Sequence, residues 1–263
     1  MKKLLVIGNP INHSLSPKLH NYWIKKNNIN AVYEKKKLEF KDLENLIIKI
    51  KKQEIYGANV TIPFKKDVIP FMDNLSEESR ITQSVNTIYL KEGKITGHNT
   101  DVSGFELAIK KTKYDLNKKK VLILGSGGVV PSLIFTLKKM KVSKIFVSNR
   151  TQKKAEKLQE LFQDLIIIKW GDVIEFDIVI NATSLGLNNE DKINLNFSNV
   201  GKGKFFYDVI YNPKETNFLK IGKKLGNKIE NGKLMFIHQA SASFKIWHDI
   251  DPKIDDEVIR LLD

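Results

Sequence analysis

The chain has 263 residues, of which 41% are hydrophobic and 28% charged, and its 44 Lys+Arg against 30 Asp+Glu give a formal net charge of +14. This length is typical of one or two domains, and the apolar fraction excludes a disordered chain. No apolar run approaches the roughly 20 residues that cross a bilayer, and the absence of cysteine excludes disulfides, thiolate metal sites and cysteine nucleophiles. We therefore expect a cytoplasmic enzyme with no bound metal and no membrane partner.

The positive charge raises the question of a nucleic-acid partner. Only Arg80, Arg150 and Arg260 are arginines, so the other 41 of the 44 basic residues are lysine. Base reading in the major groove favours the bidentate guanidinium of arginine, and the lysines are scattered along the chain. We expect no nucleic-acid partner, and a positive field that attracts small anions.

The first hundred residues alternate between short apolar runs and amphipathic stretches. Ser16 before Pro17 is typical of a helix N-cap followed by proline in the first turn, and Glu92-Gly93 is typical of a hairpin turn. Apolar residues spaced by three and four predict the second helix. We expect strands over residues 4–8, 31–37 and 57–62, helices over 16–26 and 42–52, and a hairpin of strands 85–90 and 94–97.

The rest of the chain predicts a second α/β domain. Strands are expected over 121–124, 144–148, 165–168, 178–180 and 205–209, and helices over 102–111, 133–138, 152–162, 234–247 and 254–262. Short apolar strands that alternate with helices indicate right-handed crossovers and a parallel, doubly wound sheet. We expect an α/β fold with an N-terminal α/β domain over 1–101, a Rossmann-like domain over 102–231, and C-terminal helices over 232–263 that return to the first domain.

A glycine-rich loop follows the strand at 121–124 and opens a helix. In Gly125-Ser126-Gly127-Gly128, the first glycine permits a tight turn, and Gly127 lets the backbone approach a pyrophosphate at the helix N-terminus. Val130 stands where the third glycine of the fingerprint is usual. The loop predicts a dinucleotide site, with an ordinary strand-to-helix turn as the alternative.

The end of the next strand indicates which dinucleotide the loop binds. An NAD site usually has an acid there for the ribose hydroxyls, whereas this chain has Asn149-Arg150-Thr151 and then Lys154. A guanidinium and an ammonium suit a 2′-phosphate, so NADP is the expected cofactor. The alternative is that Arg150 is a surface residue beside Thr151 as helix N-cap.

Polar side chains in the first hundred residues gather at three strand ends. Ser14 and Ser16 lie beside a helix N-terminus, a place that favours carboxylate or phosphate, although Ser16 could also cap that helix. Lys65 follows one strand, and Asp101 follows another. Asp101 could equally be the N-cap of a helix that begins at Val102.

These motifs, taken in order, resemble those of the shikimate dehydrogenase family. The resemblance covers nearly the whole chain and rests on an ordered series of segments. The series runs through the loop of Ser14 and Ser16, His20-Asn21, residues 57–65, Val85-Asn86-Thr87, residues 97–104, the glycine loop, Asn149-Arg150-Thr151, residues 181–186, residues 207–213, and Gly232 followed by Gln239.

The resemblance implies reversible NADPH-dependent reduction of 3-dehydroshikimate to shikimate in aromatic amino-acid biosynthesis. It implies that Lys65 and Asp101 form the catalytic pair, that Ser14 and Ser16 bind the substrate carboxylate, and that Thr61, Asn86, Tyr211 and Gln239 meet the ring hydroxyls. The cofactor would contact Glu77, Gly125, Ser126, Gly127, Gly128, Val129, Asn149, Arg150, Thr151, Lys154, Val209 and Gly232.

The residue types suit this chemistry. Hydride delivery to a ketone builds negative charge on oxygen, so a cation or proton donor must stand about 3 Å away. Lys65 either transfers the proton itself or stays charged while Asp101 relays it. The alternatives are a quinate/shikimate dehydrogenase with relaxed use of NAD and NADP, and a non-catalytic protein that uses the +14 charge. We expect a monomer or a homodimer.

Overall fold

The computed structural model describes residues 1–188 and 190–263. The chain divides into two compact units by its internal contacts. The first unit is Met1–Gly104 with Ile237–Asp263, and the second is Phe105–Phe236. Among the described residues, no helix is both long enough and apolar enough to cross a membrane. The predicted α/β fold, with a second parallel-sheet unit and a C-terminal return, is confirmed.

The sheet of the first unit has the strand order β2-β1-β3-β5-β6-β4. Its strands are β1 (Lys2–Gly8), β2 (Ala31–Lys37), β3 (Gly57–Val60), β4 (Asn74–Leu75), β5 (Thr87–Lys91) and β6 (Lys94–His98). β1 runs parallel to β2 and β3, whereas β5 runs antiparallel to both β3 and β6. The predicted hairpin is present, and Glu92 and Gly93 both have positive φ at its turn. The first sheet is therefore mixed.

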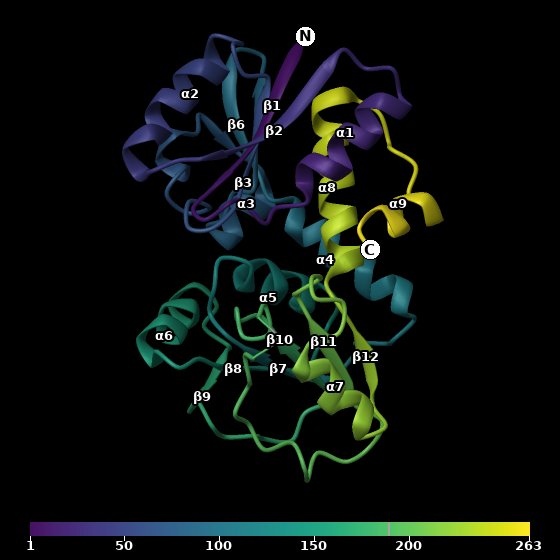
Figure 1. Ribbon diagram of the computed structural model, residues 1–263. Coiled ribbons are helices and arrows are strands. Elements are labelled where there is room, and N and C mark those ends of the chain that lie inside the picture. Colours follow the sequence, from purple (N-terminus) through teal and green to yellow (C-terminus); the bar gives the residue numbers. More distant parts are fainter. Residues whose placement is uncertain (189) are drawn as a thin grey trace. The chain divides into compact units, whose positions relative to one another are not determined.

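Helices cover both faces of this sheet. They are α1 (Ser16–Lys26), η1 (Phe40–Asp42), α2 (Leu43–Lys51), η2 (Ile69–Phe71), α3 (Glu77–Thr82) and α9 (Asp256–Leu261), together with parts of α4 (Thr100–Thr112) and α8 (Lys233–His248). α2 buries its apolar stripe on one face, and α1 and α8 lie on the other (Figure 1). The amphipathic spacing of α2 fixes which side of the helix faces the sheet, because the opposite side carries lysines.

Aromatic rings fill the face of the sheet under α1 and α8. His20 stacks on Tyr33 with ring centroids 4.2 Å apart, and Trp247 Nε1 donates to the carbonyl of Ile88 at 3.2 Å. Any side chain at Gly57 would collide with the Trp247 indole. The C-terminal helix α8 is thus seated closely on strands of the first hundred residues.

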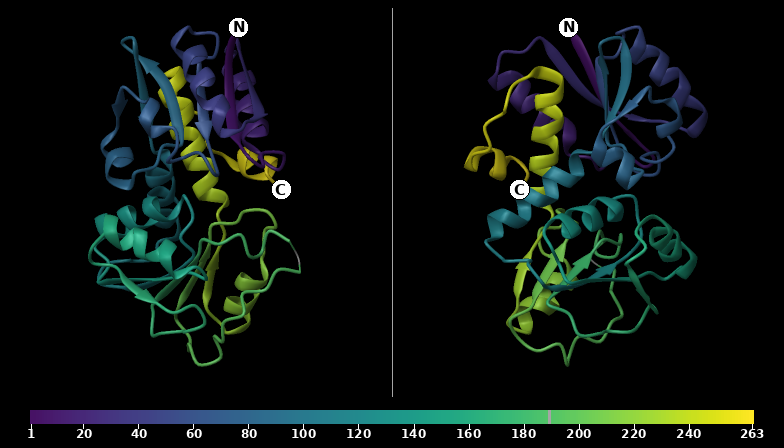
Figure 2. Two further views of the ribbon diagram at one scale, coloured as in Figure 1. Left: turned by 90° about the vertical axis from the view of Figure 1, so that its left-hand side faces the viewer. Right: turned by 180° about the vertical axis from the view of Figure 1, so that it is seen from behind.

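The sheet of the second unit has the order β12-β11-β10-β7-β8-β9, and its recorded strand pairs are all parallel. Its strands are β7 (Lys120–Leu124), β8 (Lys144–Ser148), β9 (Ile166–Ile168), β10 (Ile178–Asn181), β11 (Phe205–Asp208) and β12 (Lys228–Glu230), and its further helices are α5 (Val130–Lys139), α6 (Gln152–Leu161) and α7 (Asn217–Lys224). α4, α5 and α6 cover one face and α7 covers the other, as Figure 2 shows. This is a doubly wound sheet whose order reverses between β7 and β10.

Two predictions about helix starts are wrong. α4 begins at Thr100 rather than residue 102, because Asn99 Oδ1 accepts from the backbone N–H of Asp101 and starts the turn earlier. Asp101 is therefore not an N-cap. In α1 the N-cap is Leu15, whose own side chain makes no capping hydrogen bond, and Ser16 lies inside the first turn.

Besides the short η1 and η2, four elements were not expected: β4, α3, α7 and β12. α3 and α7 carry a recognisable start signal, because Ser76 Oγ accepts from Ser79 N and Thr216 Oγ1 accepts from Leu219 N. The strands β4 and β12 have two and three residues, which is too short for an alternating pattern to be read.

Tyr207 gives a stability prediction for the second unit. The residue is fully buried, and its hydroxyl has no hydrogen-bond partner among the described residues. Because an unsatisfied buried polar group costs about 1–3 kcal/mol, Tyr207→Phe should raise the free energy of unfolding by an amount in that range in urea denaturation. Tyr33→Phe is the matched control and should lower it, because the Tyr33 hydroxyl donates to Asn59 Oδ1 at 2.6 Å. A decrease for Tyr207→Phe would contradict the prediction.

Candidate active site

The candidate site is built around an ion pair between Lys65 and Asp101. Lys65 Nζ lies 2.5 Å from Asp101 Oδ2, and the two side chains are only 12% and 8% exposed. Lys65 comes from the loop after β3, and Asp101 from the first turn of α4. The family resemblance implied these two residues as partners although they are 36 positions apart, and the structure brings them together.

Asn86 joins this pair to the sheet. Its Nδ2 donates to Asp101 Oδ1 at 2.9 Å, and its Oδ1 accepts from the backbone N–H of Thr100 at 2.8 Å. Each oxygen of the Asp101 carboxylate is therefore bound, one by Lys65 and one by Asn86. Asn86 Nδ2 also lies 3.5 Å from Gln239 Oε1 on α8, so Gln239 is a fourth predicted residue in the same group.

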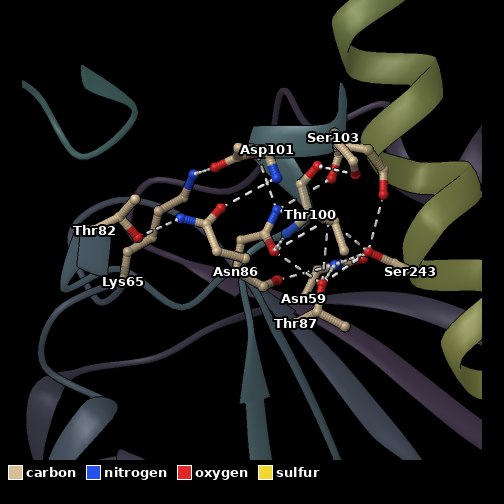
Figure 3. A network of polar contacts seen from close by, with 11 residues as sticks. Asn59, Lys65, Thr82, Asn86, Thr87, Thr100, Asp101, Ser103 and Ser243 are labelled. Carbon is tan, nitrogen blue, oxygen red and sulfur yellow. Dashed lines mark hydrogen bonds and ion pairs between the residues drawn. The ribbon is translucent and has the colours of Figure 1, made fainter. Parts of the chain in front are cut away.

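A cluster of buried hydroxyl groups lies behind Asn86 (Figure 3). Ser243 Oγ on α8 is 2.8 Å from Thr87 Oγ1, 3.1 Å from Thr100 Oγ1 and 3.0 Å from Asn59 Nδ2. These contacts tie a residue of the C-terminal helix to β3, β5 and the start of α4. Because Thr100 and Asn86 in turn hold Asp101, the cluster fixes the position of the ion pair.

The cluster extends toward α1 through Tyr33 and Asn59. The Tyr33 hydroxyl donates to Asn59 Oδ1, and Asn59 Nδ2 donates to the carbonyl of Asn86 at 3.0 Å. Burial raises the pKa of Tyr33 well above its usual range, and a hydrogen bond with Ser16 works in the opposite direction. A polar chain thus runs from Ser16 to the ion pair.

Ser14, Ser16 and Thr61 lie at the carboxyl ends of β1 and β3. The backbone N–H of Ser16 donates to Ser14 Oγ at 3.3 Å, and Ser16 is almost fully buried. Thr61 N donates to the carbonyl of Ile7, and a Cβ on Gly8 would press against the Thr61 methyl group. The parallel pairing of β1 with β3 places these polar residues at one edge of the sheet.

The glycine loop of the second unit has the shape that a dinucleotide needs. Gly125 has φ +107°, and a Cβ there would meet the carbonyl of Ala182 at 2.8 Å, so only glycine fits. A Cβ on Gly127 would meet nothing closer than that same carbonyl at 3.8 Å, so the backbone is open to an approaching ligand. Ser126, Gly128 and Val129 complete the loop, and α5 begins at Val130. These residues fit a pyrophosphate.

The segment after β8 is positioned as predicted. Asn149 Nδ2 donates to the carbonyl of Thr151 at 2.8 Å, which closes the turn, and Arg150 and Lys154 are exposed. Thr151 is the N-cap of α6, but its side chain makes no capping hydrogen bond. Because β7 and β8 are parallel neighbours, this segment and the glycine loop follow the same edge of the sheet.

The remaining predicted residues are spread over both units. Gly232 meets Val209 so closely that a Cβ would overlap the Val209 carbonyl, and Gly232 N donates to the carbonyl of Ile210. Tyr211 stacks on Phe236 with ring centroids 4.5 Å apart. Glu77 is exposed in the first turn of α3, in the first unit.

Several residues that hold the ion pair in place had no role predicted from the sequence. Tyr33, Thr87 and Ser243 were missed, although Ser243 stands four residues after Gln239 and therefore lies on the same face of α8. That spacing was the available signal. Tyr33 and Thr87 carried none, because only the sheet register brings them beside Asn59.

Two family models match the chain. Residues 6–88 match the model described as shikimate dehydrogenase substrate binding domain, and residues 106–213 match the model described as shikimate / quinate 5-dehydrogenase.

Individual proteins match over the full length. The shikimate dehydrogenase (NADP(+)) of Pelagibacter ubique (strain HTCC1062) is 59% identical over 262 residues, which cover 100% of this chain and 99% of that protein. A shikimate dehydrogenase solved in complex with NADP+ has a TM-score of 0.92 at 31% identity and covers 100% of this chain and 94% of its own. The shikimate 5-dehydrogenase of Thermus thermophilus, solved with NADP(H) and shikimate, has a TM-score of 0.89 at 28% identity, with 100% and 97% coverage.

Ser243 allows the role of the hydroxyl cluster to be tested. Ser243→Ala removes the shared partner of Thr87, Thr100 and Asn59, so we expect the free energy of unfolding to fall by about 1–3 kcal/mol. The rate of any reaction at the Lys65–Asp101 pair should also fall, because Thr100, whose backbone N–H donates to Asn86 Oδ1, loses a fixed neighbour. Ser241→Ala, on the same helix and without a side-chain hydrogen bond to the described residues, is the control. Equal effects of the two changes would refute the role of Ser243.

Proposed function

The chain belongs to the shikimate dehydrogenase family, and from that premise we propose that it catalyses the reversible NADP-dependent interconversion of shikimate and 3-dehydroshikimate. The observation that carries the proposal is the buried Lys65–Asp101 ion pair at the end of a sheet, in a chain that matches this family from end to end. The direct test is an absorbance assay that follows NADPH formation when shikimate and NADP+ are added to the purified protein. No formation of NADPH would refute the proposal.

The substrate is held by polar groups of the first unit together with Tyr211. Ser14 and Ser16, near the start of α1, bind the ring carboxylate, since hydroxyls beside a helix N-terminus suit an anion. The ring hydroxyls meet Thr61, Asn86 and Gln239, and Tyr211 contributes from the second unit. The 3.5 Å approach of Asn86 Nδ2 to Gln239 Oε1 supports a shared role for these two amides.

Lys65 and Asp101 handle the proton. When bound, NADPH supplies the hydride that reduces the ketone. Lys65 presents a positive charge to the carbonyl oxygen as negative charge develops there, and the Lys65–Asp101 pair delivers the proton that completes the alcohol. In the reverse direction the same pair takes the hydroxyl proton. The contact of Asp101 with Asn86 supports a fixed orientation for this pair.

The cofactor is NADP, held by the second unit. The backbone from Gly125 to Val129 receives the pyrophosphate, and Arg150 and Lys154, with Asn149 and Thr151, receive the 2′-phosphate. The open space at Gly127 supports the first assignment, and the place of Arg150 just after β8, the parallel neighbour of β7, supports the second. Val209 and Gly232, which lie close together, are assigned to the nicotinamide half. Glu77 is also assigned to the cofactor. The cytoplasmic location and the monomeric or homodimeric state stay predictions, which cell fractionation and light scattering would check.

The catalytic pair gives the sharpest test of the mechanism. Lys65→Ala and Asp101→Asn should each lower turnover of shikimate by about 10²-fold or more, the usual contribution of a positioned proton-transfer group. NADP+ affinity should change little, which a binding titration measures. Lys66→Ala is the control, since Lys66 is the next residue and lies outside the ion pair. Turnover close to that of the unmodified protein in either variant would sink the mechanism.

Arg150 tests cofactor choice. Arg150→Ala removes a charge-assisted hydrogen bond worth about 1.5–3 kcal/mol, so the KM for NADP should rise by about 10- to 100-fold, while the KM for NAD should hardly change. Lys157→Ala, an exposed lysine farther along α6, serves as control. An equal rise for both cofactors would show that Arg150 does not meet the 2′-phosphate. Rates with quinate in the same assay show whether the chain is instead a quinate/shikimate dehydrogenase with relaxed use of NAD and NADP.

A further inference from the structure

Asp208 is a carboxylate that the proposed reaction does not use. It is the last residue of β11, and none of its surface is exposed. Three donors converge on it: Thr216 Oγ1 lies 2.6 Å from Oδ2, and Asn181 Nδ2 and Ile210 N each lie 3.0 Å from Oδ1. Because the side chain only accepts in these bonds, the arrangement suits an ionised carboxylate.

No cation compensates this charge among residues 1–188 and 190–263. The lysines of the covering helix α7 lie on its exposed side. β11 itself carries Tyr207, and the neighbouring strand β12 carries Lys228 and Glu230. Lys228 Nζ donates to the carbonyl of Thr112 and lies over the Phe205 ring, not at Asp208. Burial, followed by the charges of Glu230 and Asp208, raises the pKa of Tyr207, so negative charge gathers here. Burial raises the pKa of Asp208 to about 6, although its three hydrogen bonds act in the opposite direction.

The charge therefore lowers stability at neutral and alkaline pH. The folded-state pKa of about 6 exceeds the ordinary value of 3.8, so folding favours the protonated form. The stability gained from the proton is fully present below about pH 4 and is lost as the pH rises through about 6. If Asp208 only stabilised the fold, a neutral side chain of the same shape would make the fold more stable.

The three donors belong to loops that Asp208 holds together. Asn181 Nδ2 also donates to the carbonyl of Leu185, which shapes the loop after β10, and Thr216 caps α7. The backbone N–H of Ile210 fixes the turn after β11, and the carbonyl of the same residue accepts from Gly232 N. One carboxylate therefore joins the turn after β11, the loop after β10 and the chain that enters α8.

These loops lie where a parallel sheet of this order binds its ligand. Ligands of doubly wound sheets sit outside the carboxyl ends of the strands, at the point where the strand order reverses. Here that point is between β7 and β10. The loop after β10 is in contact with the glycine loop, because Gly125 leaves no room for a side chain beside Ala182.

We propose that Asp208 is a positioning residue for the cofactor, whose buried charge holds Val209, Tyr211 and the loop after β10 in the shape that receives the nicotinamide half. Asp208 itself does not touch the cofactor, because none of its surface is exposed and the segments that follow β10 and β11 cover it. The proposal deepens the proposed function and rests on it. The proposal explains why the chain keeps a buried charge that lowers the stability of the fold.

Asp208→Asn tests the charge, because the amide keeps the shape and one acceptor oxygen. At pH 8 we expect NADP+ affinity to fall by about tenfold in a calorimetric titration, while Tm stays equal to that of the unmodified protein or rises. Any gain in Tm should shrink at pH 5, where Asp208 itself is mostly protonated. The value of kcat at saturating NADP+ should fall less than kcat/KM for NADP+.

Asp177→Asn is the matched control. Asp177 also accepts a backbone N–H, that of Lys120 at 2.8 Å, but it lies at the opposite end of the same sheet. Its substitution should leave NADP+ affinity unchanged. Thr216→Val is a second variant that keeps the charge and removes one donor, and it should weaken NADP+ binding by a smaller factor, which keeps the proposal testable if Asp208→Asn does not fold.

The outcomes separate the two proposals. Failure of the unmodified protein to bind NADP+ would overturn the proposed function, whereas the Tm measurements would still report on Asp208. Normal NADP+ binding by both Asp208→Asn and Thr216→Val would overturn only the role of Asp208. A fall in Tm that is equal at pH 8 and pH 5 would also overturn it, because the carboxylate would then stabilise the fold without a contribution from its charge.

Discussion

Removing a charge from water costs several kcal/mol unless an opposite charge and hydrogen bonds replace the lost solvent. In the first unit this requirement falls on Lys65 and Asp101, which are almost entirely buried. The two carboxylate oxygens of Asp101 are divided between Lys65 and Asn86, and Asn86 is held by Thr100. The sheet, the start of α4 and the C-terminal helix all supply groups to this arrangement, so the position of the ion pair depends on all three.

The second unit solves the same problem differently. Asp208 is at least as deeply buried as Asp101, yet it has three neutral donors in place of a cation. An ion pair fixes two side chains, whereas a carboxylate without a cation accepts hydrogen bonds from several neighbouring donors and fixes all of them. That difference suits the two sites, because proton transfer needs a pair, while a binding surface made of several loops needs a common point of attachment.

Features set by neighbouring residues could be predicted from the sequence, whereas contacts between residues far apart in the chain could not. Backbone and side-chain preferences within a few residues were enough to predict three features. These are the glycine loop at Gly125 and Gly127, the turn at Glu92-Gly93 and the amphipathic helix α2. The pairing of Lys65 with Asp101 came from the family resemblance, and the start of α4 at Thr100 depended on the Asn99 side chain. Ser243 could not be connected to Thr87 from the sequence, because a gap of 156 residues is closed only by the packing of α8 on the sheet.

The first unit is discontinuous, since Ile237–Asp263 packs with Met1–Gly104. Ser243 and Trp247 reach back to strands made near the beginning of the chain. During synthesis on the ribosome, the second unit is complete before those residues have left the exit tunnel. The early strands must therefore wait, with the face that α8 covers still open, until α8 has been made. A chain released before that point has Lys65 and Asp101 but lacks Ser243, the hydroxyl that joins Thr87 to Thr100 beside them.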